Sequence, residues 1–253
     1  MGESRIIAIL TDFGQKDTYV AEMKAVILSI APDVKIVDLT HEIPQGDIHL
    51  GAFNLWRSYR YFPAKTVFLC VVDPGVGTQR KPIIVKTRKY YFVGPDNGLF
   101  GYVLSEEKEF EAFEITVRGK ISYTFHGRDV FAPVSARLAK GIPPHKLGKP
   151  LKEIKLIEFP KPEIRENEIE GKIIAIDRFG NLITNISENL LNEDVEVEIK
   201  GVKIKGLKRC YEGDSPICII DSCGMLEIAL PNGDCSKFLN AKVGEKIKLR
   251  AIK

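Results

Sequence analysis

The N-terminal part of the chain alternates between short apolar runs and segments with helical periodicity, and this alternation restricts the fold more than any other feature. Runs with the length of buried strands occur at 6–10, 35–39, 66–72, 83–86 and 90–93. Segments with the spacing of amphipathic helices occur at 19–30, 47–59 and 130–140, and Asp47 is placed to cap the second of them. Because strands that alternate with helices usually pair in parallel, we expect an α/β domain at 1–150 with a mostly parallel central sheet.

The sequence pattern changes beyond residue 150. Residues 151–167 are rich in Lys, Glu and Pro and have no helical period, which is typical of a linker. Residues 168–253 contain short β-patterned runs that are separated by Gly and by Asn or Asp turns. These runs are 171–177, 182–186, 195–199, 202–204, 217–220, 225–229 and 246–252. We expect them to form a small all-β barrel.

Composition and charge argue against several classes of protein. The 37 Lys and Arg residues exceed the 34 Asp and Glu residues by only +3, which is too little for a nucleic-acid-binding surface. No apolar run approaches the roughly 20 residues of a membrane span, and no signal peptide is recognisable after Met1. The 5 cysteines have no Cys-x-x-Cys spacing, so we expect reduced thiols in a cytoplasmic protein, without disulfides or zinc.

Polar residues stand directly after the expected strands of the N-terminal domain. They occupy 11–14, 40–42 and 73–80, and a further polar cluster at 124–129 precedes the last helix. In an open α/β sheet, ligands bind outside the carboxyl ends of the strands. We therefore expect these clusters to meet at one edge of the sheet and to form a site there.

Four side chains in these clusters suit particular chemistry. Asp12 can accept hydrogen bonds from two vicinal hydroxyl groups. Arg80 follows Asp73 across a tight turn and can fold back to pair with it. His126 titrates near neutral pH and suits proton transfer. Each of them also has a structural alternative as a turn residue, a helix cap or a solvated loop residue.

The familiar cofactor and nucleophile motifs are absent from the sequence. Gly75 and Gly77 would let the backbone approach a ligand, but no Gly-Lys-Ser/Thr follows them, and the third glycine of a dinucleotide fingerprint is missing. No pair of histidines has metal-ligand spacing, and no Gly-x-Ser-x-Gly supports a serine triad. We therefore expect neither a nucleotide cofactor nor a metal.

Two loops of the C-terminal part are candidate binding elements. The loop 177–181 places Asp177 and Asn181 between two expected strands, and Asn181 can offer a donor and an acceptor to the edge of a base. The loop 222–227 leads into another strand. An ordinary β-turn is the alternative for both loops.

The motifs of these clusters occur together in one order along the chain. They are Thr11-Asp12-Phe13-Gly14, Asp38-Leu39-Thr40-His41, Asp73-Pro74-Gly75-Val76-Gly77-Thr78-x-Arg80, Pro95-Asp96-Asn97-Gly98, Thr124-Phe125-His126-Gly127-Arg128-Asp129, Phe179-Gly180-Asn181 and Leu226-Glu227-Ile228-Ala229. In this combination the sequence resembles the S-adenosylmethionine hydroxide adenosyltransferase (hydrolase) family, whose relatives include fluorinase and chlorinase. The resemblance extends over nearly the whole chain.

The resemblance implies a fold, an assembly and a reaction. The α/β domain would bind a nucleoside and carry the catalytic residues, and the C-terminal domain would be a β-barrel. Active sites would lie between the subunits of a homotrimer. The reaction would be the hydrolysis of S-adenosylmethionine to adenosine and L-methionine, without a cofactor. By motif match, Asp73, Arg80 and His126 would be the catalytic residues that activate water.

The resemblance also implies how the substrate is held. Asp12 would bind the ribose hydroxyls, and Phe125 would belong to the same substrate site. Asp177 would contact the methionine amino group, and Asn181 would contact the adenine. The remaining contacts would come from Ser222 at the methionine carboxylate and from Glu227 and Leu230 beside the adenine.

The sequence departs from the halogenases at informative positions. Fluorinase has Tyr in place of Asp73, Tyr-Ser in place of His126-Gly127, and Arg in place of Cys223. A buried carboxylate at Asp73 would repel a halide ion. Besides hydrolysis, halogenation and non-catalytic binding of adenosine or S-adenosylmethionine stay open as alternatives. A preference for one sulfonium epimer would fit the same residues.

Overall fold

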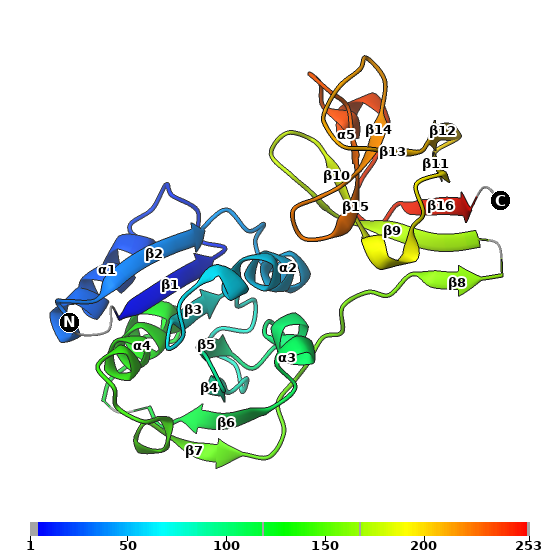
Figure 1. The fold of residues 1–253 in the computed structure, drawn as a ribbon. Coiled ribbons are helices and arrows are strands. Elements are labelled where there is room, and N and C mark those ends of the chain that lie inside the picture. The colour runs from blue at the N-terminus through cyan, green and yellow to red at the C-terminus, as the bar shows by residue number, and fades with distance from the viewer. Residues whose placement is uncertain (1–4, 118, 167, 252–253) are drawn as a thin grey trace. The chain divides into compact units, whose positions relative to one another are not determined.

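The computed structural model of the protein describes residues 5–117, 119–166 and 168–251. The chain is divided into two units, Met1–Phe159 and Pro160–Lys253 (Figure 1). The first unit holds a mixed sheet with helices, and the second holds a barrel-like sheet.

The strands of the first unit form one sheet with a parallel half and an antiparallel half. They are β1 (Ile6–Thr11), β2 (Lys35–Thr40), β3 (Val67–Val71), β4 (Pro82–Thr87), β5 (Tyr91–Pro95), β6 (Phe110–Ile115) and β7 (Gly148–Leu151). Their order across the described part of the sheet is β2-β1-β3-β5-β4-β6-β7. The pairs among β2, β1, β3 and β5 are parallel, whereas β4, β6 and β7 are joined by antiparallel pairs.

The expectation of a mostly parallel sheet is therefore wrong. Residues 88–90 alone connect β4 to β5. A parallel pair needs a crossover of about a dozen residues or more, so a link this short can only close a hairpin. Three of the four parallel strands, β1, β2 and β3, carry the polar clusters 11–14, 40–42 and 73–80 at their carboxyl ends, which keeps the expected site edge intact.

Helices cover both faces of this sheet. They are α1 (Tyr19–Ile30), α2 (Ile48–Ser58), α3 (Gly101–Glu107) and α4 (Ala132–Ala139), with short 3-10 turns at Tyr59–Tyr61 and Pro144–Lys146. On one face α1 packs against α4, and Met23 and Ile27 share a buried cluster with Ile7, Ile9 and Leu69. On the other face α2 packs against α3, where Phe68 stacks on Phe92 with ring centroids 5.2 Å apart.

Local signals in the sequence explain most of these elements. The side chain of Asp47 accepts a hydrogen bond from the backbone N–H of Leu50 at 2.9 Å, which confirms the expected cap of α2. The helix expected at 130–140 begins earlier, with a π-helical turn at Gly127–Phe131 that leads into α4. The sequence analysis missed α3, β6 and β7.

The second unit is built from short strands around their own apolar core. They are β8 (Glu163–Arg165), β9 (Glu168–Ile176), β10 (Leu182–Ser187), β11 (Val195–Ile199), β12 (Val202–Lys205), β13 (Leu207–Lys208), β14 (Ile217–Ile220), β15 (Met225–Ala229) and β16 (Lys246–Ala251), with a 3-10 turn at Glu188–Leu190 and a short helix α5 (Cys235–Phe238). The order within the described residues is β12-β11-β16-β9-β10-β15-β14-β13, with β8 on β9. Because β12 also approaches β14, the sheet is nearly closed.

Two further observations bear on the sequence analysis. In the described ranges of the chain, no helix is both long and apolar enough to cross a membrane. Each of the cysteines, Cys70, Cys210, Cys218, Cys223 and Cys235, is a free thiol. Burial raises the pKa of the Cys218 and Cys235 thiols to about 12, so both are neutral core residues.

Candidate active site

The loops that follow β1, β2 and β3 converge at one edge of the sheet. Asp12 comes directly after β1, and its Oδ2 accepts the backbone N–H of Gly46, in the loop after β2, at 2.9 Å. A Cβ atom on Gly46 would lie 3.5 Å from Cβ of Pro74, the residue after Asp73. The expected meeting of these clusters is therefore present in the structure.

Asp12 is a partly buried carboxylate. Burial raises its pKa, and the nearby negative charge of Asp73 adds to the increase, while the Gly46 N–H acts in the opposite direction. The fold thus holds two carboxylates near each other at this edge. Such an arrangement costs folding stability and is common where charge serves a ligand.

Asp73 and Arg80 form a buried ion pair. Nε of Arg80 donates to both carboxylate oxygens of Asp73 at 3.0 Å, and Nη2 makes a further short contact with Oδ2. The exposed fractions of the two side chains are only 6% for Arg80 and 4% for Asp73. A planar guanidinium held in this way has a fixed orientation, so the position of its other N–H groups is set as well.

Arg80 also contacts His126, which lies 46 residues further along the chain. Nη2 of Arg80 lies 2.8 Å from Nδ1 of His126. Because a guanidinium has only donors, Nδ1 must accept, and the proton of the neutral imidazole then lies on Nε2. The carbon Cζ of Arg80 lies 5.3 Å from the ring centroid of the buried Phe131, which supports the guanidinium from one side.

The environment keeps His126 neutral. Burial lowers its pKa and the positive charge of Arg80 lowers it further, while Asp73 and Asp129 act in the opposite direction. His126 therefore presents an Nε2–H donor at neutral pH. Nη1 of Arg80 is a second donor at this site, since it is buried without a hydrogen-bond partner among the described residues.

The two loops that carry these groups pack tightly on each other. Gly77 has a φ of +76°, and a Cβ atom there would lie 2.5 Å from the backbone oxygen of Tyr123. Only glycine permits this approach. Phe125 is 7% exposed and packs edge-on against Phe13 and Tyr19, with ring centroids 5.9 Å and 5.1 Å apart. It supports the His126 loop from the core side.

The candidate residues of the second unit form their own group. Asp177 Oδ1 accepts the backbone N–H groups of Phe179 and Asn181, each at 2.9 Å, and its Oδ2 accepts Nδ2 of Asn181 at 3.0 Å. Asp177 thus shapes its own loop and orients the amide of Asn181. Because Nδ2 donates inward, the side-chain oxygen of Asn181 is oriented by the same contact.

The other candidates of this unit lie on and beside β15. Ser222 is exposed in a turn, and Asp221 holds that turn by accepting the N–H groups of Cys223 and Met225 at 2.7 Å and 2.9 Å. Leu230 follows β15 and packs against the core of the unit.

Glu227 contacts Tyr211, a residue that the sequence analysis missed. Glu227 is buried in β15 and accepts the hydroxyl of Tyr211 at 2.8 Å. Burial, the hydrogen bond to Glu227 and the negative charges of Glu227, Asp177 and Asp221 together raise the pKa of Tyr211 to about 12. Tyr211 thus contacts one of the candidate residues directly. No motif in the sequence marks it.

Models of one protein family match both parts of the chain. Residues 7–148 match the model of the SAM hydroxide adenosyltransferase N-terminal domain, and residues 171–248 match that of the C-terminal domain. A curated (R)-S-adenosyl-L-methionine hydrolase of Thermus thermophilus is 36% identical over 97% of this chain and 99% of its own length. Another of the same name, from Methanocaldococcus jannaschii, is 37% identical over 96% and 95%.

More distant enzymes and a solved structure are similar as well. A fluorinase of an Actinoplanes species is 31% identical over 72% of this chain and 71% of its own. The crystal structure of an uncharacterized conserved protein from Thermotoga maritima has a TM-score of 0.91 at 37% identity, over 97% of this chain and 100% of that one. The resemblance inferred from the motifs is confirmed: the chain belongs to the SAM hydroxide adenosyltransferase family.

Proposed function

We propose that this protein hydrolyses S-adenosyl-L-methionine to adenosine and L-methionine. The observation that carries the proposal is Arg80, which is buried and joins Asp73 to His126 while keeping a further N–H group for another partner. Relatives that cover nearly the whole chain are named (R)-S-adenosyl-L-methionine hydrolases. We propose the same sulfonium epimer as the preferred substrate.

The reaction needs an oriented oxygen nucleophile and little else. Hydroxide forms a bond to C5′ of the ribose as the C5′–S bond breaks, and the electron pair of that bond goes to sulfur, which becomes the neutral thioether of methionine. When water attacks instead, one proton is released as well. Because the sulfonium already provides a good leaving group, the chemistry requires no metal, cofactor or covalent intermediate.

The donors at the site suit an anionic nucleophile. Nη1–H of Arg80 and Nε2–H of His126 would hold the hydroxide oxygen, and Asp73 would keep the guanidinium in place. Since Nε2 of the neutral His126 already carries a proton, we assign it to orienting the nucleophile rather than to removing a proton from it. Orientation of this kind is worth several kcal/mol of activation free energy in well-aligned reactions.

The substrate contacts and the assembly follow from the family resemblance. We propose Asp12 for the ribose hydroxyls, with Phe125 beside it, and the second unit for the rest of the substrate. There the assigned contacts are Asp177 for the amino group, Ser222 for the carboxylate, and Asn181, Glu227 and Leu230 for the adenine. We also propose a homotrimer in which the two groups of residues come from neighbouring subunits, and its mass in solution, measured by light scattering, tests this.

The remaining proposals concern the cellular compartment of the protein and its binding partners. The free thiols favour a reducing compartment such as the cytoplasm. The small net charge of +3 gives no reason to expect nucleic acid as a partner.

The direct test is turnover of the two sulfonium epimers by the purified protein. We expect adenosine and L-methionine in equal amounts, faster with the (R) epimer, as followed by chromatography. His126→Ala and Asp73→Ala should each lower kcat by about 10²- to 10³-fold, the range for loss of one preorganised donor, because His126 is such a donor and Asp73 fixes Arg80. Adenosine binding without turnover would contradict the proposal. So would formation of 5′-chloro-5′-deoxyadenosine in excess chloride.

The pH dependence gives a second test. Below the lowered pKa of His126 the imidazole is protonated and can no longer accept from Arg80, so kcat/KM should fall only at pH values below the usual 6.5 of histidine. Above that limb the rate should rise with hydroxide concentration. The contribution of His126 to folding stability has the same direction: it is present above pH 6.5 and is lost as the pH falls through the lowered pKa.

The variant His126→Gln tests whether the ionisation of His126 causes the fall of kcat/KM at acidic pH. His126→Gln offers an amide oxygen to Arg80 but does not titrate, so its lower activity should lack the acid limb. The same limb in the profile of this variant would show that another group causes it. Melting temperatures across the same pH range check whether the contribution of His126 to folding stability is lost as the pH falls.

A further inference from the structure

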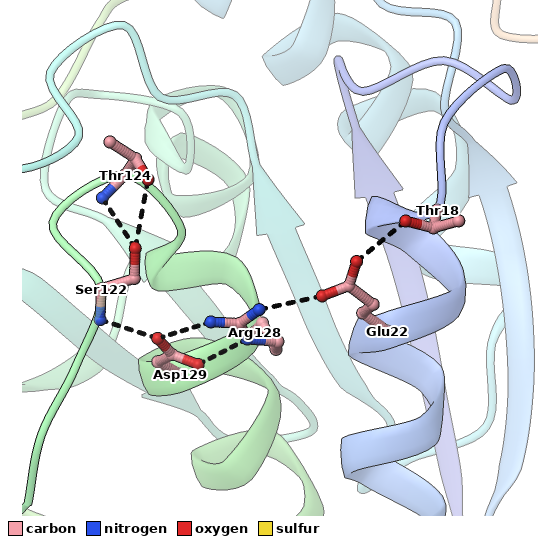
Figure 2. A network of polar contacts seen from close by, with 6 residues as sticks. All are labelled: Thr18, Glu22, Ser122, Thr124, Arg128 and Asp129. Atoms are coloured by element: carbon pink, nitrogen blue, oxygen red, sulfur yellow. Dashed lines mark hydrogen bonds and ion pairs between the residues drawn. The ribbon is translucent and has the colours of Figure 1, made fainter.

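Arg128 is held between carboxylates from two different elements (Figure 2). Its Nη1 donates to Oε2 of Glu22 on α1 at 2.9 Å. Its Nε and Nη2 donate to Oδ1 and Oδ2 of Asp129 at 2.7 Å and 3.1 Å. Glu22 also accepts the hydroxyl of Thr18, which precedes the helix, at 2.9 Å. This network joins residues 106 apart and ties the π-helical turn to the start of α1.

The same network holds the loop that ends at His126. Asp129 Oδ2 accepts the backbone N–H of Ser122 at 2.8 Å, and Ser122 Oγ accepts the N–H of Thr124 at 3.2 Å. The guanidinium of Arg128 lies over the ring of Phe125, with Cζ 5.0 Å from its centroid. The loop 122–126 is therefore held at its beginning by Asp129 and near its end by Arg128.

Gly127 joins His126 to Arg128 through a tightly packed stretch of backbone. A Cβ atom on Gly127 would lie 3.1 Å from Sδ of Met23 and 3.2–3.3 Å from the rings of Phe125 and Phe13. The backbone between His126 and Arg128 is thus packed directly on α1. A backbone shift at Arg128 would be passed on to His126, because only Gly127 separates the two residues.

We propose that Arg128, between Glu22 and Asp129, is a positioning residue that sets the loop 122–126 so that His126 meets Arg80. This inference rests on the proposed function only for its kinetic consequences. Arg128 has no assigned contact with the substrate and acts through His126. Misplacement of a catalytic group by about 1 Å can cost on the order of 10²-fold in rate.

The charges around His126 predict changes of its pKa in opposite directions when Arg128 or Asp129 is replaced. Asp73 and Arg80 face the imidazole from the loop after β3, and Asp129 acts on it from its own turn. Arg128 is paired with Asp129 and offsets its charge. Removing Arg128 leaves Asp129 unpaired and should raise the pKa of His126, whereas removing the charge of Asp129 should lower it.

The experiment compares Arg128→Met with Asp129→Asn. Both should lower kcat by about 10- to 100-fold with KM changed by less than about 3-fold, because both release the loop. The pKa of His126, followed by NMR titration of the 4 histidines with His126→Gln for assignment, should rise in the first variant and fall in the second. Arg128→Lys, which keeps a charge beside Asp129, should recover part of kcat.

Arg60→Met is the matched control. Arg60 also donates to a carboxylate, Glu106, at 3.0 Å, and its Cζ lies 5.3 Å from the ring centroid of Trp56. Within the part of the chain that the structure describes, it makes no hydrogen bond, ion pair or ring contact with the His126 loop. It should keep the kinetic constants and the His126 pKa of the parent protein. Equal losses in Arg60→Met and Arg128→Met, or pKa changes of the same sign in Arg128→Met and Asp129→Asn, would overturn the proposal. The NMR readout can be obtained even if the protein does not hydrolyse S-adenosylmethionine.

Discussion

Arg80→Met should abolish nearly all turnover, with a loss in kcat of at least about 10³-fold. Removing one preorganised donor from a catalytic site typically costs about 10²- to 10³-fold. Arg80 supplies Nη1–H to the nucleophile in our proposal and also fixes both Asp73 and His126. Adenosine release from S-adenosyl-L-methionine under single-turnover conditions measures the effect.

The stability of this variant has to be measured beside its activity. Asp73 is 4% exposed, and a buried charge that loses its partner costs about 3–5 kcal/mol. Arg80→Met should therefore melt at a lower temperature. The double variant Asp73→Asn with Arg80→Met removes both charges and should regain much of the stability without regaining activity. Recovery of activity in the double variant would show that Arg80 acts only through the fold.

Arg80→Lys gives a finer comparison. A single ammonium keeps the positive charge next to Asp73, but it cannot form a fork on the carboxylate and contact Nδ1 of His126 at the same time. We expect stability close to that of the parent protein and a kcat lowered by about 10²-fold. A kcat equal to that of the parent would mean that charge alone is sufficient at this position.

The elements that the sequence predicted best have strong local signals. Helix α1 and its periodic apolar residues, the Asp47 cap of α2, and the alternating strands of the second unit all follow from patterns within a few residues. The two strands of the β4–β5 hairpin were expected, but their antiparallel pairing was not. The sequence analysis expected parallel pairing here because the preceding strands alternate with helices.

Elements without a local signal were missed. Helix α3 is short, begins at Gly101 and has no side-chain cap. A Cβ atom on Gly101 would collide with the backbone of Ile157, so this glycine is required by a contact with a distant segment rather than by helix propensity. Periodicity cannot reveal a contact of that kind.

The residues of the candidate site also differ in whether the sequence marks them. Motifs placed Asp73, Arg80 and His126 together, and the 2.8 Å contact between Arg80 and His126 joins them in the structure. The supporting network could not be read from the sequence, since Glu22 is 106 residues from Arg128 and belongs to no motif. Sequence patterns therefore identified the groups assigned to the chemistry, while the groups that orient them became visible only in the structure.

Asp12→Ala should lower kcat/KM by about 10²- to 10⁴-fold. A hydrogen bond to a charged group contributes about 1.5–3 kcal/mol, and we assign two of them to the ribose hydroxyls. One lone pair of the carboxylate already serves the N–H of Gly46, and a carboxylate has room for about three more acceptor contacts. Initial rates over a range of S-adenosyl-L-methionine concentrations measure the loss.

The 2′-deoxy analogue of the substrate tests the assigned contact directly. The parent protein should discriminate against it by about 10- to 100-fold, because one hydrogen bond to Asp12 is lost. In Asp12→Ala that discrimination should nearly disappear, since the partner of the 2′-hydroxyl is already gone. Discrimination that persists in the variant would assign the hydroxyl to a different residue.

Replacing Asp12 by Asn should leave folding stability unchanged or raise it, although loss of the carboxylate should lower activity. Burial and the charge of Asp73 raise the pKa of Asp12, so its ionised form is less favourable in the folded protein than in the unfolded chain at neutral pH. Asp12→Asn, which keeps an acceptor for Gly46, should therefore melt at the same temperature as the parent protein or higher, with the gain lost as the pH falls and Asp12 itself becomes protonated. A residue that lowers stability yet is needed for turnover is kept for its ligand, and a less stable Asp12→Asn would remove that reason for assigning Asp12 to the ribose.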